Sequence, residues 1–156
     1  MRFWSGLMNE SRGFIIKSYV LGEVMPMYQQ NYQLSIRDIN YANHMDHLAL
    51  LNYLHETRVR FLREYGYSEL DVDGKGSGLV VADLQCSYRR ECFYGDVIRV
   101  SLALKVVSPT RLTLLYSIYK DDGALVANAE IRVALLSAAR KIIAIPDYLV
   151  NLASSV

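Results

Sequence analysis

Four segments in the second half of the chain alternate between apolar and polar residues with a period of two. Their apolar positions are Val80, Ala82, Leu84, Cys86 and Tyr88; Ile98, Val100, Leu102 and Leu104; Leu112, Leu114, Tyr116 and Ile118; and Leu125, Ala127, Ala129, Ile131, Val133 and Leu135. Such alternation is typical of strands that bury one face. The stretch KDDGA at 120–124 places Asp and Gly where a hairpin turn between the last two strands needs them. With the β-prone residues 28–37, we expect a five-stranded antiparallel sheet that has one apolar face.

A helical spacing of apolar residues runs from about Asp46 to Tyr65. The positions at this spacing are Leu48, Leu51, Leu54, Phe61, Leu62 and Tyr65, and Leu50 and Val59 widen the apolar face. The few polar positions are His55, Glu56, Arg58 and Arg60, so we expect a helix that is nearly surrounded by protein. Gly66 is expected to end it as a C-cap glycine. This helix is the natural cover for the apolar face, which predicts an α+β fold with a curved sheet around one central helix.

The length of 156 residues suits one domain with a real core. We expect residues 1–26 to be a poorly ordered leader and residues 27–150 to form a single domain. Lys17 interrupts the apolar segment GFIIKSYVLG and no small-residue cleavage site follows, which argues against a signal peptide. No apolar run approaches the roughly 20 residues that span a bilayer, so we expect no membrane partner.

A single helix cannot cover five long strands. We therefore expect a second copy to bury the remaining apolar surface, and with it a sheet edge, in a two-fold dimer, which could pair further into a tetramer. The formal net charge of +1 argues against nucleic-acid binding, which needs a basic surface. The two cysteines, Cys86 and Cys92, are too few for a disulfide scaffold, and we interpret them as reduced thiols of a cytoplasmic protein.

The densest polar cluster of the chain is DINYANHMDH at 38–47, and the third histidine of the chain, His55, follows closely. The cluster could be a metal site, a proton-transfer site or a polar loop that caps a helix. A zinc site would use H-x-D-H with His55. Metallohydrolase motifs of this appearance also carry an H-x-H pair, which is absent here, and no further histidine remains. We therefore predict no metal and no other cofactor.

The stretch IRDINYANHMDHLALLNYLHETRVRFLREYGYSE resembles the thioesterase family whose pattern is D-x-D-x-x-G-H-V-N-N followed by a helix with E-x-A-R. FYGDVIRV is similar to the Y-G-D-x-L-x-V of the same family. The resemblance to this family, the 4-hydroxybenzoyl-CoA thioesterase-like family, covers residues 30–146. It implies the hotdog fold, a five-stranded antiparallel sheet wrapped around one long central helix. More narrowly, the form I-N-Y-x-N-H, with H-E-x-R on the helix, resembles a bacterial branch of acyl-CoA thioesterases.

The resemblance assigns residues of the polar loop one by one. Asp38 matches the first aspartate of the pattern and Asn40 matches the second, which is the nucleophile or general base in the best-understood branch. An amide has no basic oxygen at neutral pH, so Asn40 can position water or the thioester carbonyl but cannot accept the proton. His44 matches the histidine of the pattern. The backbone N–H of about His47, at the start of the helix, is the expected oxyanion donor.

Another group must then act as the base. Asp46 is a carboxylate beside the oxyanion site, but Asp is also a preferred N-cap. His44 has a suitable intrinsic pKa for proton transfer, although its position in the family is more often structural. Glu56 corresponds to a helix carboxylate that serves as the base from the partner subunit in another hotdog branch, or it pairs with Arg60 at i, i+4. The sequence leaves these alternatives open.

We therefore predict an enzyme, a cytoplasmic thioesterase that hydrolyses a fatty or aromatic acyl thioester of CoA or acyl carrier protein. The candidate catalytic residues are Asn40, His44, Asp46, His47 and Glu56, and the candidate substrate-binding residues are Tyr41, Lys75, Arg89 and Arg90. The glycines of DVDGKGSG at 71–78 lack the spacing of a phosphate-binding loop, so this stretch is expected to be a linker or a lid. The alternatives are a dehydratase or hydratase on the same fold and a non-catalytic acyl-thioester-binding protein.

Overall fold

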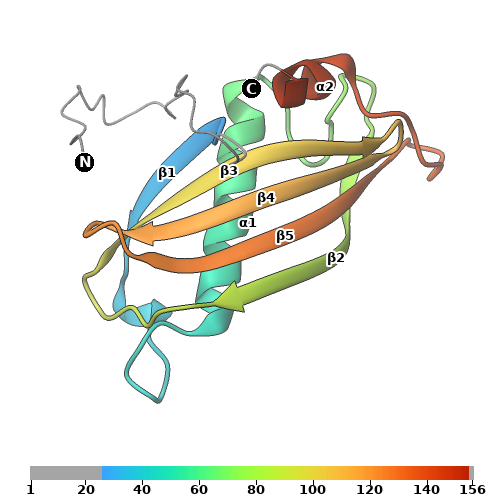
Figure 1. The fold of residues 1–156 in the computed structure, drawn as a ribbon. Coiled ribbons are helices and arrows are strands. Elements are labelled where there is room, and N and C mark those ends of the chain that lie inside the picture. The colour runs from blue at the N-terminus through green and yellow to red at the C-terminus, as the bar shows by residue number, and fades with distance from the viewer. Residues whose placement is uncertain (1–25, 155–156) are drawn as a thin grey trace.

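The computed structural model describes residues 26–154. The strands are β1 (Tyr28–Gln33), β2 (Gly78–Tyr88), β3 (Val97–Ser108), β4 (Arg111–Lys120) and β5 (Leu125–Leu136), and the helices are η1 (Ile36–Asp38), α1 (His47–Glu64) and α2 (Asp147–Ser154). The strands form one antiparallel sheet in the order β1-β3-β4-β5-β2, and α1 crosses one of its faces (Figure 1). The predicted α+β fold of five strands and one long helix is confirmed. Residues 1–25 of the predicted leader lie outside the described residues.

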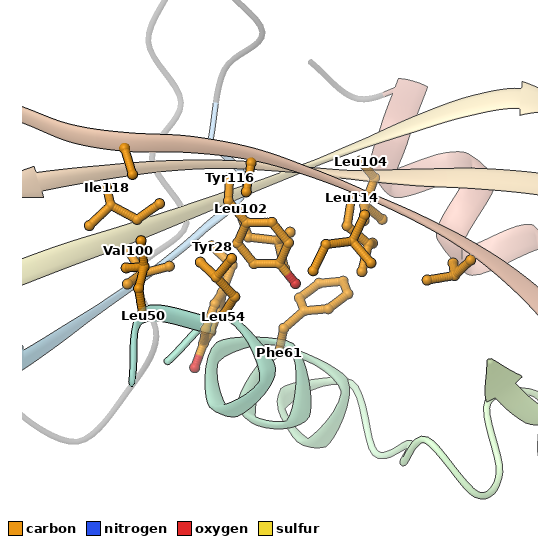
Figure 2. Packing of buried hydrophobic residues seen from close by; sticks show 14 of the residues in the cluster. Tyr28, Leu50, Leu54, Phe61, Val100, Leu102, Leu104, Leu114, Tyr116 and Ile118 are labelled. Atoms are coloured by element: carbon orange, nitrogen blue, oxygen red, sulfur yellow. The ribbon is translucent and has the colours of Figure 1, made fainter. Parts of the chain in front are cut away.

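The core lies between α1 and the apolar face of the sheet. The predicted inward positions of β3, β4 and most of β5 are buried: Ile98, Val100, Leu102, Leu104, Leu112, Leu114, Tyr116, Ile118, Ala127, Ala129, Ile131, Val133 and Leu135. Tyr116 of β4 points toward the helix, and Phe61 of α1 points toward the sheet (Figure 2). Period-two alternation therefore identified the buried face of these three strands correctly.

Both ends of α1 follow from local sequence. Asp46 is the N-cap, and its carboxylate accepts a hydrogen bond of 2.7 Å from the Leu48 N–H. At the other end Gly66 has φ +80, a conformation that is strained for residues with a Cβ. Its N–H donates to Arg63 and the N–H of Tyr67 donates to Leu62, which is the Schellman pattern. The expected C-cap role of Gly66 is confirmed.

Three expectations need correction. The first strand ends at Gln33 rather than 37, because Ser35 and Asp38 form a hydrogen-bonded turn in which η1 begins. The buried face of α1 is centred on Leu50, which has no exposed surface, whereas Leu48 is 58% exposed. The helix is not nearly surrounded by protein in a single copy, because eight of its 18 residues are exposed, namely His47, Leu48, Asn52, His55, Glu56, Arg60, Arg63 and Glu64. Helix α2, which the sequence pattern did not suggest, is held by a 2.8 Å hydrogen bond from the Tyr148 hydroxyl to the Val72 carbonyl.

Strand β2 is the free edge of the sheet beyond β5. A bulge between Val81 and Asp83 shifts its register, so that Val81 lies opposite Val133 and Leu84 lies opposite Ile131. Since both of these partners are buried, Val81 and Leu84 belong to the inner face, and Val80 and Ala82 do not share it as predicted. Both inner-face side chains remain largely exposed, at 48% and 41%. Within residues 26–154, no helix is long and apolar enough to cross a membrane.

Candidate functional site

A tight loop precedes α1 and fixes the side chain of Asn40. The Asn40 N–H donates to the His44 carbonyl at 3.0 Å, and the Asn43 N–H donates to the Asn40 carbonyl at 2.9 Å. Asn43 adopts φ 68, which Asn tolerates better than most residues. The side-chain oxygen of Asn40 accepts a 2.9 Å hydrogen bond from the Ala42 N–H. The amide oxygen is therefore engaged, and the NH₂ group is the part of Asn40 that can serve a ligand.

The aspartate that matches the first position of the family pattern has a structural role. Asp38 accepts hydrogen bonds from the backbone N–H of Ser35 at 2.7 Å and from the Tyr53 hydroxyl at 2.5 Å. Burial and this contact with Asp38 raise the pKa of Tyr53. The carbonyl of Asp38 also accepts from the Asp46 N–H at 2.7 Å, which fixes the position of the helix start.

A pocket of about 340 Å³ opens beside the start of α1. It is lined by residues of the loop before α1, the start of the helix, the end of β2 and the segment after it: Asn40, His44, Met45, His47, Tyr88, Arg89, Arg90, Glu91 and Cys92. The N–H of His47 makes none of the backbone hydrogen bonds found among the described residues, whereas the Leu48 N–H is occupied by Asp46. A helix N-terminus with a free N–H favours negative charge.

Tyr88 joins the end of β2 to the first turn of α1. Its hydroxyl donates a 3.0 Å hydrogen bond to the His47 carbonyl. Burial, reinforced by neighbouring Cys86, raises the pKa of Tyr88 to about 12, so the hydroxyl keeps its proton at neutral pH. Cys92 is held through its carbonyl, which accepts from the Met45 N–H at 2.7 Å. Burial raises the pKa of the Cys92 thiol to about 11, which makes it an apolar wall rather than a nucleophile.

The structure gathers only some of the predicted site residues. Asn40, His44, His47, Arg89 and Arg90 line the pocket. Tyr41 is fully exposed at the tip of the loop and does not line it. Lys75 lies in the segment that follows the far end of α1, so the length of the helix, roughly 27 Å for 18 residues, separates it from the pocket. A single copy of the chain therefore does not bring Lys75 together with Arg89 and Arg90, and its role in substrate binding stays a prediction.

The two carboxylates considered as bases also lie outside the pocket lining. Asp46 is engaged as the N-cap, and its carboxylate is 3.7 Å from the His47 ring. Glu56 accepts a 2.7 Å hydrogen bond from Arg60, and both side chains are about half exposed. The i, i+4 pair that the sequence suggested is therefore present. Of the candidate bases, only His44 lines the pocket, where its Nε2 lies 3.8 Å from Glu91.

The geometry of a shared metal site is absent from the described part of the chain. No group of three or more His, Cys, Asp or Glu side chains converges there as metal ligands would. The Nε2 of His55 is 2.9 Å from Glu69, whereas His44 and His47 face the pocket at the helix start. The three histidines therefore lie at two separate locations: His44 and His47 line the pocket, and His55 contacts Glu69.

Four pocket residues were missed by sequence reasoning, namely Met45, Tyr88, Glu91 and Cys92. Tyr88 ended the alternating pattern of its strand and was interpreted only as a core position. Cys92 was interpreted only as a reduced thiol, and this interpretation gave no sign that it lines the pocket. The run RREC at 89–92 carries the only available signal, a group of charges directly after a strand.

Comparison with known proteins shows which family this chain belongs to and which structures resemble it. The sequence profile of the thioesterase-like superfamily matches residues 34–151. A protein of Aquifex aeolicus that is assigned only provisionally as an esterase is 32% identical over 100 residues, which cover 64% of this chain and 77% of that protein. The crystal structure of a hypothetical protein from Aquifex aeolicus is 25% identical and superposes with a TM-score of 0.71 over 80% of this chain and 97% of that one.

Two more distant structures share the fold. A 1,4-dihydroxy-2-naphthoyl-CoA thioesterase from Synechocystis has a TM-score of 0.73 at 18% identity, covering 82% of this chain and 96% of its own. A hypothetical protein from Staphylococcus aureus in complex with CoA has a TM-score of 0.73 at 19% identity, covering 89% of this chain and 87% of its own. These superpositions identify the sheet and helix as the hotdog fold.

Proposed function

Because this chain belongs to the thioesterase-like superfamily, we propose that it hydrolyses acyl-CoA thioesters by attack of water in the pocket at the start of α1. The observation that carries the proposal is the lining of that pocket. It brings together the Asn40 amide, the first helical residue His47 and the cations Arg89 and Arg90. Asn40 and His47 can polarise the thioester carbonyl, and the two arginines can hold the phosphorylated leaving group.

The carbonyl end of the substrate is the part that the loop and the helix can polarise. As water attacks, negative charge develops on the thioester oxygen, and the free N–H of His47 and the Asn40 NH₂ group can both donate to it. In other enzymes one such donor contributes about 10²–10³-fold in rate. Tyr88, through its hydrogen bond to the His47 carbonyl, holds the helix start in place beside the end of β2.

The nucleotide end is proposed to meet Arg89 and Arg90. Both backbone N–H groups donate to the Val126 carbonyl, at 2.7 and 3.1 Å, which fixes the segment while the side chains remain exposed. A guanidinium presents several donors that suit phosphate oxygens. The wall formed by Met45 and Cys92, both buried, is proposed to contact the acyl group near the reacting carbon.

The identity of the base is a separate proposal, because Asn40 cannot accept a proton. Asp46 and Glu56 remain hypotheses that Asp46→Asn and Glu56→Gln would test. Since neither carboxylate lines the pocket, we expect both variants to keep most of the wild-type activity. Retained activity would leave an imidazole as the proton acceptor, and His44 and His47 are the two in the pocket lining.

A homodimer in the cytoplasm is also part of this proposal. It is supported by the free edge of β2 and by the exposed apolar side chains on its inner face, Val81 and Leu84. Cys86 and Cys92 are free thiols, which suits a reducing compartment.

A non-catalytic acyl-thioester-binding protein is the second candidate, and Asn40 in place of an aspartate is the observation that favours it. The test is to incubate the purified protein with acyl-CoA substrates of graded length and with aromatic acyl-CoA, and to follow free thiol, with and without a chelator. We expect thiol release that survives chelation. Binding without release from any substrate would favour the second candidate, and loss of release on chelation would require a metal.

A further inference from the structure

The pocket at the start of α1 contains one carboxylate that the proposed chemistry has not yet used. Among the nine residues that line the pocket, Glu91 is the only Asp or Glu. Its side chain is 65% exposed, and its one ion pair in the described structure is with His44, whose Nε2 lies 3.8 Å away. None of the hydrogen bonds found among the described residues involves the Glu91 carboxylate, so its negative charge is directed at the imidazole.

Met45 holds both members of this pair in place. Its N–H donates a 2.7 Å hydrogen bond to the carbonyl of Cys92, the residue after Glu91, and its carbonyl lies 3.3 Å from the Nδ1 of His44. Met45 and Cys92 are both buried. The loop before α1 and the segment after β2 are therefore fixed against each other, at the end of the molecule where β2 ends and α1 begins (Figure 1).

The contact with Met45 determines which ring nitrogen of His44 can accept a proton. A carbonyl oxygen can only accept, so the Nδ1 of His44 carries the hydrogen and donates it to the Met45 carbonyl. In the neutral ring the lone pair is then on Nε2, the nitrogen that lies 3.8 Å from Glu91. When Nε2 takes a proton, the ring becomes a cation beside a carboxylate, and the attraction between the two charges favours the transfer.

His47, the other imidazole of the pocket lining, is less suited to this role. Its Nδ1 lies 3.7 Å from the Asp46 carboxylate, but that carboxylate already accepts the Leu48 N–H at 2.7 Å as the N-cap. His47 is also the first residue of α1, where the positive end of the helix dipole opposes a cation. The His47 side chain is 66% exposed, whereas that of His44 is 31% exposed, so a charge on His47 is screened more strongly.

We propose that the Nε2 of His44 is the general base of thioester hydrolysis and that Glu91 is a positioning residue, which acts through His44 by stabilising its imidazolium form. The inference rests on the proposed thioesterase function. The Nε2 atom takes a proton from water as the water oxygen bonds to the thioester carbon, and the charge that develops on the carbonyl oxygen meets the donors of Asn40 and His47. The C–S bond then breaks, the imidazolium gives the proton to the departing thiolate, and a carboxylic acid and a thiol result.

The first test measures kcat and KM for thiol release in three variants. We expect His44→Gln to lower kcat by roughly 10²-fold or more. Glu91→Gln should lower kcat by roughly fivefold or more without raising KM, because a unit charge about 4 Å away has an effect of this size even in the dielectric of water. Glu130→Gln, the same change at an exposed position of β5, should leave both constants unchanged.

Circular dichroism verifies that each variant folds. Full activity of a folded His44→Gln or Glu91→Gln protein would overturn the inference. An inactive wild type would instead contradict the proposed function itself.

A double variant tests whether Glu91 acts through His44. In the His44→Gln background no imidazolium forms, so adding Glu91→Gln should lower the remaining kcat by less than about twofold. Glu91→Asp keeps the negative charge and should retain more activity than Glu91→Gln. An effect of Glu91→Gln that is equally large with and without His44 would overturn the inference, and so would equal losses in Glu91→Asp and Glu91→Gln.

His47→Gln separates the two imidazoles of the pocket. The substitution keeps the backbone N–H that the proposed function uses, so kcat should fall less in His47→Gln than in His44→Gln. A larger loss in His47→Gln would assign the base to His47 and overturn the inference.

Discussion

The substitution Glu69→Gln addresses the most heavily buried ion pair of the described structure. The Arg58 side chain is 7% exposed and the Glu69 side chain is 23% exposed. Glutamine keeps the size of the side chain but removes the negative charge, so the guanidinium of Arg58 stays buried without a counter-charge. The hydroxyl of Tyr116 lies close to Arg58, but a neutral hydroxyl cannot compensate for a charge.

The expected loss follows from the cost of an uncompensated buried charge. Removing one partner of a buried pair costs about 3–5 kcal/mol. Since Glu69 retains some solvent contact and glutamine can still accept a hydrogen bond, we expect about 2–3 kcal/mol here. The double variant Arg58→Met with Glu69→Gln removes both charges, and it should recover part of the stability lost by Glu69→Gln alone. The matched control Glu56→Gln breaks a pair that is about half exposed, and it should cost only about 0.3–0.5 kcal/mol.

Equilibrium urea unfolding of the four proteins, followed by circular dichroism, gives these free energies from midpoints at a common m value. The reasoning is refuted if Glu69→Gln and Glu56→Gln destabilise the protein equally. It is also refuted if the double variant is less stable than Glu69→Gln, because Arg58 would then stabilise the fold without its carboxylate.

Three further outcomes are expected from the same structure. Asp46→Ala should cost about 0.5–2 kcal/mol in urea unfolding because the N-cap to Leu48 is lost, whereas Asp46→Asn should cost almost nothing, and an equal loss in both would contradict the capping role. Gly66→Ala, at φ +80 with open space around the added methyl, should lower stability by about 1 kcal/mol through backbone strain alone, and an unchanged midpoint would refute this. Because the folded-state pKa of Glu69 lies below its unfolded value, its contribution is complete above that unfolded value, ordinarily 4.5, and is lost as the pH falls through the folded value. Wild type and Glu69→Gln should therefore converge in stability in acid, and a constant difference would contradict the assignment.

Sequence patterning predicted the sheet well where each strand keeps one register. In β3 and β4 the strict alternation from Ile98 to Ile118 corresponds to the buried face, since a half-buried strand has a period of two. It failed in β2, where the bulge at Val81 reverses the facing of the residues before it. A bulge depends on pairing with β5, which no local pattern contains.

The candidate site was predicted in part for a related reason. Asn40, His44 and His47 are close in sequence, so the loop and the helix start bring them together locally. Glu69 was not considered, although it binds both Arg58 and His55, because it reaches them only after the chain has turned at Gly66. Contacts between segments that meet only after the chain reverses direction depend on tertiary packing, and they leave little trace in the local sequence pattern.

The most direct test of the central claim, that thioester hydrolysis takes place in the pocket beside the start of α1, is the steady-state rate of thiol release in two matched variants. Asn40→Leu removes an amide in the pocket lining, and Asn31→Leu makes the same change at an exposed position of β1. The account predicts a fall of roughly 10²-fold in kcat/KM for Asn40→Leu and wild-type activity for Asn31→Leu. Wild-type activity of a folded Asn40→Leu protein would contradict it.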